Sequence, residues 1–517
     1  MTDPENKPSA ISGEKTPADS PPPINPKRNN YAIACATMAS MASVLLGYDV
    51  GVMSGAVIFI KKDFGISDVK VEILVGIISL YSIFGAAAAG RISDWIGRRY
   101  TMALAAGFFF FGALLMGFAT NYSFLMFGRF VAGVGTGFAG LIASVYTAEI
   151  SPASTRGCLT SFPEVFINFG ILLGYVSNLA FSNLPTYLSW RFMLGIGVIP
   201  SAFLVIIVLA MPESPRWLVM QGRILEAKRV LDKVSISLQE SQQRLADIKI
   251  AAGIHPNVTD DVVPPPQPQK LVWKELFLHP TPAVRHILIA AIGLHFFQQA
   301  SGIDGVVLYS PRIFEKAGIT SSSHILLATV AVGIVKTGSI LIATFLIDRI
   351  GRRPLILTSV AGKAVSLTML AMSLTIINNS HEKVKWAIVV CIATILADVA
   401  FFSIGLGPMV FVYSAEIFPL RLRAQGVSVG IIVNRITSGV VTMTFLSLYR
   451  AITIGGAFFL YAGITAVGWL FFYLVFPETR GRNLEDVEGV FGNILCRLKK
   501  NKGGSGRMSS GGGAPNN

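Results

Sequence analysis

Twelve apolar stretches in two sets of six are the feature of this sequence that most constrains its fold. Because about 20 apolar residues cross the hydrocarbon core of a bilayer as a helix, each stretch predicts one transmembrane helix. The first set covers about 31–60, 71–89, 100–120, 122–148, 158–180 and 191–211. The second covers about 284–314, 324–347, 355–377, 386–415, 425–448 and 454–476. The expected fold class is an all-α membrane protein with twelve transmembrane helices in two pseudo-symmetric six-helix halves.

The composition excludes a soluble protein. Of 517 residues, 52% are hydrophobic and 14% are charged, and the mean hydropathy is +0.60. The formal net charge of +14 does not indicate nucleic-acid binding, because the basic residues cluster between and after the apolar stretches, as the orientation rule for membrane proteins predicts. The four cysteines have no metal-ligand spacing and imply no disulfide framework. We therefore expect a lipid bilayer as the surroundings, no nucleic-acid partner and no metal.

The segments outside the apolar stretches define five regions. Residues 1–30 are polar and proline-rich and predict a disordered cytoplasmic tail, followed by a first half at 31–211. Residues 212–283 predict a cytoplasmic loop with surface helices, because leucine, valine and isoleucine recur there at helical spacing among charges. A second half at 284–476 and a cytoplasmic tail at 477–517 complete the chain. Arginines fall in alternate connections, which places both termini in the cytoplasm, and we expect the plasma membrane as the location.

The two halves repeat each other, which indicates an internal duplication. Three motifs of the first half return in the same order 254 to 267 residues later. They are GRISDWIGRR at 90–99 with LIDRIGRR at 346–353, YTAEISPASTR at 146–156 with YSAEIFPLRLR at 413–423, and PESPR at 212–216 with PETR at 477–480.

Acids and arginines occur together in these repeated motifs and predict a cytoplasmic gate held by ion pairs. Glu149 with Arg156, and Glu416 with Arg423, are the expected partners. The alternative is that the arginines only set topology and the acids only solvate loops, but topology alone requires no acids. The predicted gate residues are Asp94, Arg98, Arg99, Glu149, Arg156, Asp348, Arg352, Arg353, Glu416 and Arg423.

No motif predicts an enzyme. The sequence has no phosphate-binding glycine loop on a strand, no nucleophile with a base and no metal-ligand constellation, so we expect no catalytic residue and no cofactor.

The stretch from Leu288 to Phe314 combines polar side chains with helix-loosening glycines. Polar groups are costly at membrane depth unless they meet partners or line a wet cavity. An interrupted apolar segment of this kind predicts a substrate site near the middle of the bilayer. Its polar residues are Gln298, Gln299, Ser301, Asp304 and Tyr309, and its glycines are Gly293, Gly302 and Gly305.

The motifs carry a family resemblance. GRISDWIGRR, PESPRWL, QQASGID, LIDRIGRR and PETRG, in this order, resemble the sugar porter family of the major facilitator superfamily. Within that family, FPEVFINFGILLGYVSN at 162–178 and EIFPLRLRAQG at 416–426 are similar to the plant polyol/monosaccharide transporters. The resemblance implies the major facilitator fold, two parallel six-helix halves related by an axis along the membrane normal.

The resemblance also implies substrate-binding residues. The glutamine pair of the family's seventh helix matches Gln298 and Gln299, its fifth-helix glutamine matches Asn168, its eleventh-helix asparagine matches Asn434, and its seventh-helix tyrosine is close to Tyr309. Side-chain amides suit a polyol, because each offers donors and an acceptor to adjacent hydroxyls.

Four positions depart from the family pattern. The seventh-helix asparagine is Asp304, the eighth-helix asparagine is Lys336, the tenth-helix glutamate is Ser403 and the tenth-helix tryptophan is Phe411. Because each charge is costly alone at membrane depth, we predict that Asp304 and Lys336 form an ion pair. The alternative is that Lys336 extends to an interface while Asp304 faces water. Charge-assisted donors without a flat tryptophan surface favour a linear polyol as well as a pyranose ring.

Asp49 in the first stretch and Arg129 in the fourth are charges at membrane depth. They match the aspartate and arginine that form the proton switch of proton-coupled sugar porters. Arg129 nearby favours the ionised carboxylate, and separation favours proton uptake by Asp49. The alternative is a static structural pair.

The sequence therefore predicts a monomeric, proton-coupled symporter that imports linear polyols, monosaccharides or both by alternating access. Two alternatives remain: a facilitative carrier that ignores protons, and a sugar sensor with the architecture of a transporter. The short tails, which contain no recognisable signalling module, disfavour the sensor.

Overall fold

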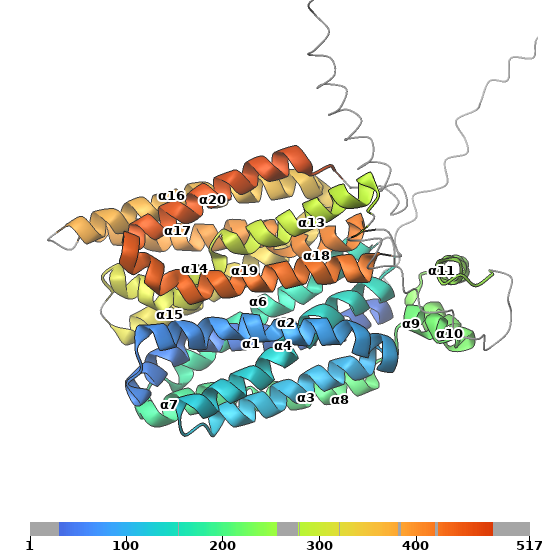
Figure 1. The fold of residues 1–517 in the computed structure, drawn as a ribbon, viewed down its shortest axis with the longest axis horizontal. Helices are drawn as coiled ribbons and strands as arrows, with labels where there is room; N and C mark the ends of the chain where they lie inside the picture. The colour runs from blue at the N-terminus through green and yellow to red at the C-terminus, as the bar shows by residue number, and fades with distance from the viewer. Residues whose placement is uncertain are drawn as a thin grey trace, which may run out of the picture.

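The computed structural model describes residues 30–152, 155–255, 278, 280–319, 321–380, 384–418 and 422–478. Within these residues, twelve helices or helix pairs are long and apolar enough to cross a membrane. They run side by side along the long axis of one bundle (Figure 1). The predicted all-α fold with twelve transmembrane helices is confirmed. Of the predicted tails at 1–30 and 477–517, residues 1–29 and 479–517 lie outside the described residues.

The two halves of the sequence form the two sides of the bundle, blue to cyan on one side and yellow to red on the other (Figure 1). The spans of the first half are α1 (Asn30–Phe64), α2 (Asp68–Ile96), α3 (Arg98–Gly117), α4 (Tyr122–Ile150), α5 with α6 (Arg156–Thr160 and Phe162–Phe181), and α7 with α8 (Thr186–Gly195 and Val198–Ala210). Those of the second half are α13 with α14 (Pro282–Ala300 and Ile303–Lys316), α15 (Ser322–Ile350), α16 (Arg352–Asn379), α17 with α18 (Lys385–Ile404 and Leu406–Ile417), α19 (Arg423–Ile452) and α20 (Ile454–Val475).

Three short helices lie outside the bundle at one of its ends (Figure 1). They are α9 (Pro215–Met220), α10 (Ile224–Val234) and α11 (Leu238–Ala251), within the loop for which the sequence predicts surface helices. We call this end of the bundle the α9–α11 end and the opposite end the distal end.

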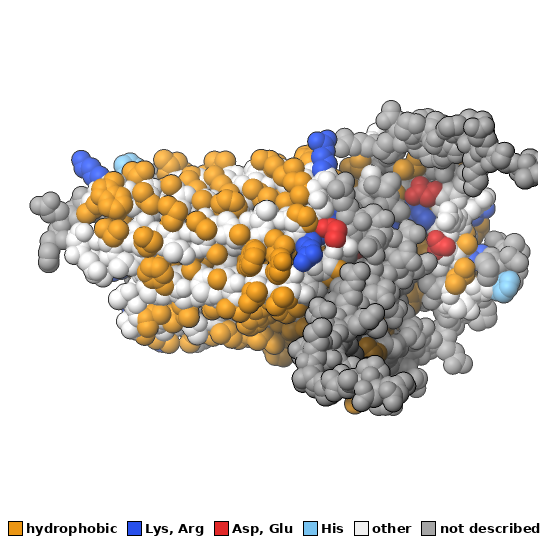
Figure 2. All heavy atoms as spheres, turned by 90° about the horizontal axis from the view of Figure 1, so that it is seen from above, with side chains coloured by type: hydrophobic (Ala, Val, Ile, Leu, Met, Phe, Trp, Pro, Cys, Tyr) orange, Lys and Arg blue, Asp and Glu red, His pale blue; other side chains and the backbone are white. Residues whose placement is uncertain are grey.

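The flank of the bundle is apolar. Figure 2 shows hydrophobic side chains along its length, with lysine and arginine side chains gathered towards its ends. Large side chains such as Phe203, Ile206 and Leu474 are exposed on this surface. A band of exposed apolar side chains between charged ends is the surface that a bilayer solvates, so the chain is an integral membrane protein.

Glycines bring α1 and α6 into backbone contact. A Cβ atom on Gly47 would lie 1.9 Å from the carbonyl oxygen of Ile167, and one on Gly170 would lie 2.2 Å from the carbonyl oxygen of Val44. No side chain fits at these distances, so this crossing requires glycine. The close approach holds the polar face of α6 beside Asp49 of α1.

The seventh span is interrupted where the sequence predicts it. Between α13 and α14, Gly302 has a φ of 81°, in the left-handed region, and a side chain there would meet the Tyr461 ring at 2.7 Å. Gly293 and Gly305 lie inside the two helices instead. The break separates the glutamine pair at the end of α13 from Asp304 at the start of α14.

At the distal end, polar contacts join the two halves. The Glu72 carboxylate of α2 accepts hydrogen bonds from the backbone N–H and the hydroxyl of Ser447 on α19, both at 2.6 Å. Asp68 forms ion pairs with Arg312 of α14, at 3.2 Å, and with Arg450 of α19. We call these five residues the distal latch. The structure therefore has the two halves joined at its distal end.

We predict that Glu72→Ala opens the distal end, because it removes two charge-assisted hydrogen bonds between the halves. At about 1.5–3 kcal/mol each, their loss shifts the conformational equilibrium by about tenfold or more. Electron–electron resonance distances between spin labels at Lys70→Cys and Lys316→Cys, exposed positions of α2 and α14, measure the opening. Glu226→Ala, on the surface of α10, is the control. An unchanged distance distribution in Glu72→Ala would contradict the latch.

Candidate functional site

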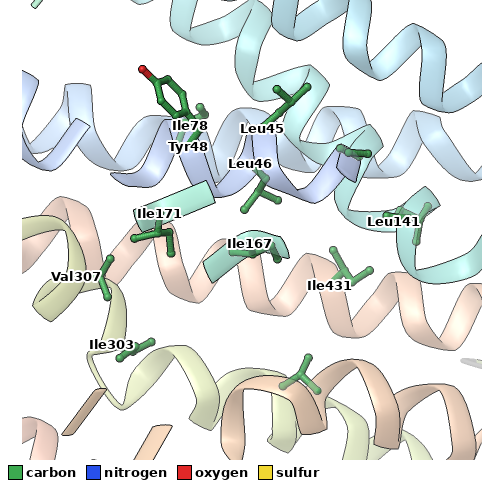
Figure 3. Close-up of a cluster of buried hydrophobic side chains, with 14 of the residues drawn as sticks. Leu45, Leu46, Tyr48, Ile78, Leu141, Ile167, Ile171, Ile303, Val307 and Ile431 are labelled. Atoms are coloured by element: carbon green, nitrogen blue, oxygen red, sulfur yellow. The ribbon is translucent and has the colours of Figure 1, made fainter. Parts of the chain in front are cut away.

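A cavity of about 90 Å³ lies between the two halves. Its walls combine apolar and polar side chains from both. Figure 3 shows part of the apolar wall, with Leu46, Ile167 and Ile171 from the first half facing Ile303, Val307 and Ile431 from the second. The polar lining residues are Asp49, Ser79, Arg129, Thr136, Glu164, His295, Gln298, Gln299, Asp304, Lys336, Asn434, Arg435 and Ser438.

The predicted amides meet in this cavity. The Gln298 amide nitrogen donates to the carbonyl oxygens of Leu406 and Gly407 at 3.4 and 3.3 Å, where the tenth span breaks between α17 and α18. Asn434 donates to the Gln298 side-chain oxygen at 2.6 Å, and Gln299 donates to the Asn434 side-chain oxygen at 3.3 Å. The buried side-chain oxygen of Gln299 has no hydrogen-bond partner among the described residues. It is therefore a free acceptor, oriented by a network that fixes the other amides.

Asp304 and Lys336 both line the cavity, but the structure contains no direct ion pair between them. The Ser438 hydroxyl donates to the Asp304 carboxylate instead. The ammonium of Lys336 lies 5.8 Å from the centre of the Phe402 ring, and the charge of Glu164 acts on it more strongly than that of Asp304. The prediction of a two-residue pair is wrong because it omits Glu164, a third charge at the same depth.

Two predicted binding residues lie outside the cavity lining. Asn168 is fully buried one helical turn beyond Glu164, and its amide donates to the Glu164 backbone and side-chain oxygens at 2.8 and 3.4 Å. Tyr309 donates to the Thr442 carbonyl at 2.9 Å and stacks on Phe445. The Tyr309 hydroxyl thus joins α14 to α19, whereas the Asn168 amide bonds within α6. Phe411 does line the cavity.

Three titratable cavity residues were missed by the sequence prediction: Glu164, His295 and Arg435. The signal was present, because each is a titratable side chain inside an apolar stretch. Glu164 lies four residues before Asn168, on the same face of the helix. His295 bonds the Ser414 hydroxyl at 3.1 Å through its Nε2, and its buried Nδ1 has no partner in the structure.

Asp49 and Arg129 form the buried ion pair that the sequence predicts at this depth. The Arg129 Nη1 lies 2.8 Å from both carboxylate oxygens of Asp49. The guanidinium also donates to the carbonyl oxygens of Leu74 and Val75 on α2, each at 3.2 Å. The arginine of α4 is therefore anchored to α2, and its only contact with α1 among these bonds is the one to Asp49.

A second buried ion pair lies behind the cavity wall. Lys363 of α16 donates to both carboxylate oxygens of Asp398 on α17, at 2.8 and 2.9 Å, and both side chains are fully buried. The Lys363 ammonium lies 5.6 Å from the centre of the same Phe402 ring that Lys336 approaches. The Phe402 ring is therefore in reach of both lysines.

The predicted gate residues are paired within each half. Glu149 accepts from the Arg98 guanidinium at 3.1 and 3.2 Å, and Glu416 accepts from that of Arg352 at 3.3 and 2.9 Å. The expected Glu149–Arg156 pair is wrong, because Arg98 is the ion-pair partner of Glu149. Arg98 begins α3 directly after Gly97, which connects α2 to α3. The side chains of Arg423, the expected partner of Glu416, and of Asp348 are not among the described side chains. Asp94 pairs with Arg98 at 3.1 Å.

The acids of the PESPR and PETR motifs cap the same turns. Glu213 accepts from the backbone N–H groups of Arg98 and Arg99 at the start of α3, and burial raises the pKa of its carboxyl. Glu478 accepts from those of Arg352 and Arg353 at the start of α16, at 3.1 and 3.0 Å. A carboxylate at a helix N-terminus satisfies free N–H groups and complements the helix dipole. The two halves therefore share the same hydrogen bonds at these helix starts, as well as the same motifs.

Arg244 of α11 attaches the loop helices to the bundle. Its guanidinium donates to the carbonyl oxygens of Glu149, Ile150 and Ser151, which end α4. Burial of this guanidinium lowers its pKa to about 10. A cation at a helix C-terminus is electrostatically favourable.

Comparison with known proteins identifies the family. Residues 35–491 match the family described as "Sugar (and other) transporter". The chain is 61% identical to Polyol transporter 5 of Arabidopsis thaliana, over 95% of this chain and 93% of the relative. It is 32% identical to the glucose transporter GlcP of Staphylococcus epidermidis, over 89% of this chain and 97% of that protein. The solved structure of the proton:xylose symporter XylE, bound to 6-bromo-6-deoxy-D-glucose, superposes with a TM-score of 0.76 at 24% identity, over 90% and 100% of the two chains.

The matches to the sugar transporter family and to Polyol transporter 5 show that the chain is a membrane transporter and not an enzyme, and the superposition shows that it has the fold of the solved major facilitator symporter. The chain belongs to the sugar transporter family and resembles the plant polyol transporters within it.

We predict that Lys363→Met lowers stability by about 3–5 kcal/mol, because it leaves the Asp398 carboxylate buried without a counter-charge. The double variant Lys363→Met/Asp398→Leu should recover most of this loss, since apolar side chains of similar size often replace a buried ion pair at little cost. Thermal unfolding of the purified protein in detergent measures both. Losses that simply add in the double variant would show that the two residues act independently.

Proposed function

We propose that this protein is a proton-coupled symporter that imports linear polyols, monosaccharides or both by alternating access. The observation that carries the proposal is that the Asp49–Arg129 ion pair and the amides of Gln298, Gln299 and Asn434 line one cavity. A proton-binding group and a hydroxyl-binding group that share one space are able to bias the same conformational change.

The amides supply recognition of hydroxyl groups. The free side-chain oxygen of Gln299 accepts a hydroxyl proton, and the network through Asn434 and Gln298 holds it in place. Phe411 offers an apolar ring to the carbon chain or ring of the substrate. The similarity to Polyol transporter 5 supports a polyol, and the similarity to the glucose transporter GlcP supports a monosaccharide.

The ion pair supplies the coupling. Arg129 is anchored to carbonyl oxygens of α2, so a movement of α1 relative to α2 and α4 separates Asp49 from its counter-charge. A lone carboxylate in a poorly solvated site takes up a proton, and the neutral acid then lets the helices move without carrying a buried charge. The proton:xylose symporter whose structure superposes on this chain supports such coupling.

Alternating access follows from the distribution of contacts. The distal latch joins the halves at one end, whereas the ion pairs Arg98–Glu149 and Arg352–Glu416 at the α9–α11 end lie within single halves. The arginine distribution places the α9–α11 end and both termini in the cytoplasm, so the described state is closed towards the outside. We assign the protein to the plasma membrane, where import from outside uses the inward proton gradient.

We predict that Asp49→Asn abolishes accumulation of labelled sorbitol against a gradient but leaves exchange, because the proton site is lost and the amide site is not. With one proton per substrate, an imposed difference of one pH unit drives about tenfold accumulation in liposomes containing the wild-type protein. The variant should equilibrate only. Asp63→Asn, on the same helix but outside the cavity lining, should accumulate as the wild type does. Full accumulation by Asp49→Asn would contradict the coupling, and equilibration without accumulation by the wild type would identify a facilitative carrier.

A further inference from the structure

Four charged side chains line the cavity without forming direct ion pairs with one another: Glu164, Asp304, Lys336 and Arg435. The polar contacts of the two acids are to neutral groups. Asn168 donates to Glu164 and Ser438 donates to Asp304, while Lys336 faces the Phe402 ring. All four side chains nevertheless line one cavity, so the acids and the bases face the same space. The acids and bases therefore lie close enough to interact but too far apart to bond directly.

Glu164 and Arg435 each cross the interface between the halves. A Cβ atom on Gly407 of α18 would lie 3.5 Å from the Glu164 carboxylate, so this acid of the first half reaches the second. A Cβ atom on Gly140 of α4 would lie 3.9 Å from the Arg435 Nη2, so this base of the second half reaches the first. A ligand that touches both therefore contacts both halves.

The charges of the cavity balance. Its lining contains three carboxylates, Asp49, Glu164 and Asp304, and three bases, Arg129, Lys336 and Arg435. An anionic or cationic ligand would leave an excess charge in a poorly solvated space. A neutral ligand preserves the balance, so the charges do not indicate a sugar acid, a phosphate or an amine.

A hydroxyl group fits a gap between an acid and a base. It donates its proton to the carboxylate and accepts a hydrogen bond from the cation, and both bonds are charge-assisted. Consecutive hydroxyls on an open carbon chain are able to rotate towards groups on different helices. The hydroxyls of a pyranose ring are fixed relative to one another, so a ring fills fewer of these gaps.

We propose that Glu164, Asp304, Lys336 and Arg435 form a charged clamp in which the hydroxyls of an acyclic polyol bridge acid to base across the two halves. The inference rests on the proposed transport function and names its preferred substrate class. It assigns binding roles to Glu164 and Arg435, which the sequence prediction omitted. It also explains how substrate binding holds the halves together, because a bridge from Glu164 joins α6 of the first half to α15 or α19 of the second.

The test compares an acyclic hexitol with a ring that cannot open. Binding of sorbitol and of methyl β-D-glucopyranoside is measured by calorimetry on the purified full-length protein, for the wild type, Glu164→Gln and Arg435→Gln. Because a hydrogen bond to a charged group is worth more than a neutral one, we expect each variant to weaken sorbitol binding by about tenfold or more. Binding of the glucoside, which depends mainly on the amides, should weaken by less than about threefold.

The exposed ion pair Arg223–Glu226 of the α10 region supplies matched controls. Arg223→Gln and Glu226→Gln remove the same charges outside the cavity and should leave both affinities unchanged. If Arg435→Gln is not expressed in the membrane, the same binding measurements are made on Arg435→Lys and on the isosteric variant Glu164→Gln. Equal weakening for the two ligands, or none for sorbitol, would overturn the clamp while leaving transport itself intact. Failure of the wild type to bind either ligand would instead overturn the proposed function.

Discussion

A charge buried away from water must find a partner, and this constraint organises the whole bundle. Arg98 and Arg352 meet carboxylates at the helix ends, Lys363 meets Asp398 behind the cavity, and Arg129 meets Asp49 beside it. The cavity is where the rule is relaxed. There, acids and bases from the two halves face the same cavity without forming direct ion pairs. Their charged groups are therefore able to form hydrogen bonds with a ligand.

Because of the internal duplication, the ion pairs at the α9–α11 end occur once in each half with equivalent residues. The charged residues of the cavity are not equivalent in the two halves. Glu213 and Glu478 cap equivalent helices through equivalent backbone bonds, so each half is braced in the same way. Asp49 and Asp304 lie 255 positions apart in the two halves, close to the offset of the repeated motifs, but their partners differ. Asp49 is held by an arginine, whereas Asp304 is held by a serine hydroxyl. A carboxyl group that alternates between an ion-paired carboxylate and a neutral acid suits proton coupling, and one that keeps an accessible carboxylate suits substrate binding.

The features that follow from hydrophobic length and helix-breaking residues could be predicted from the sequence. The twelve spans and the break at Gly302 are of this kind, and the resemblance placed Gln298, Gln299 and Asn434 correctly on the cavity. Errors arose where two polar residues share one face of a helix and only their position along the helix decides which of them lines the cavity. Glu164 and Asn168 lie one helical turn apart on the same face of α6, and the sequence pattern does not decide between them.

Partner choice also could not be predicted from sequence spacing. Glu149 had two candidate arginines, and the geometry of the turn at Gly97 selects Arg98. Lys363 and Asp398 lie 35 positions apart on neighbouring helices, so only their packing reveals the pair. Tyr309 is polar at membrane depth because its hydroxyl bonds a helix carbonyl, which a sequence pattern does not distinguish from binding a ligand.

The central claim is that one cavity couples proton and polyol movement, and proton flux during polyol uptake tests it most directly. Cells that lack endogenous polyol uptake would express the protein together with a cytosolic pH indicator. Addition of sorbitol outside should acidify the cytosol at a rate proportional to labelled sorbitol uptake. Sorbitol uptake at the same rate with no change in cytosolic pH would contradict the account.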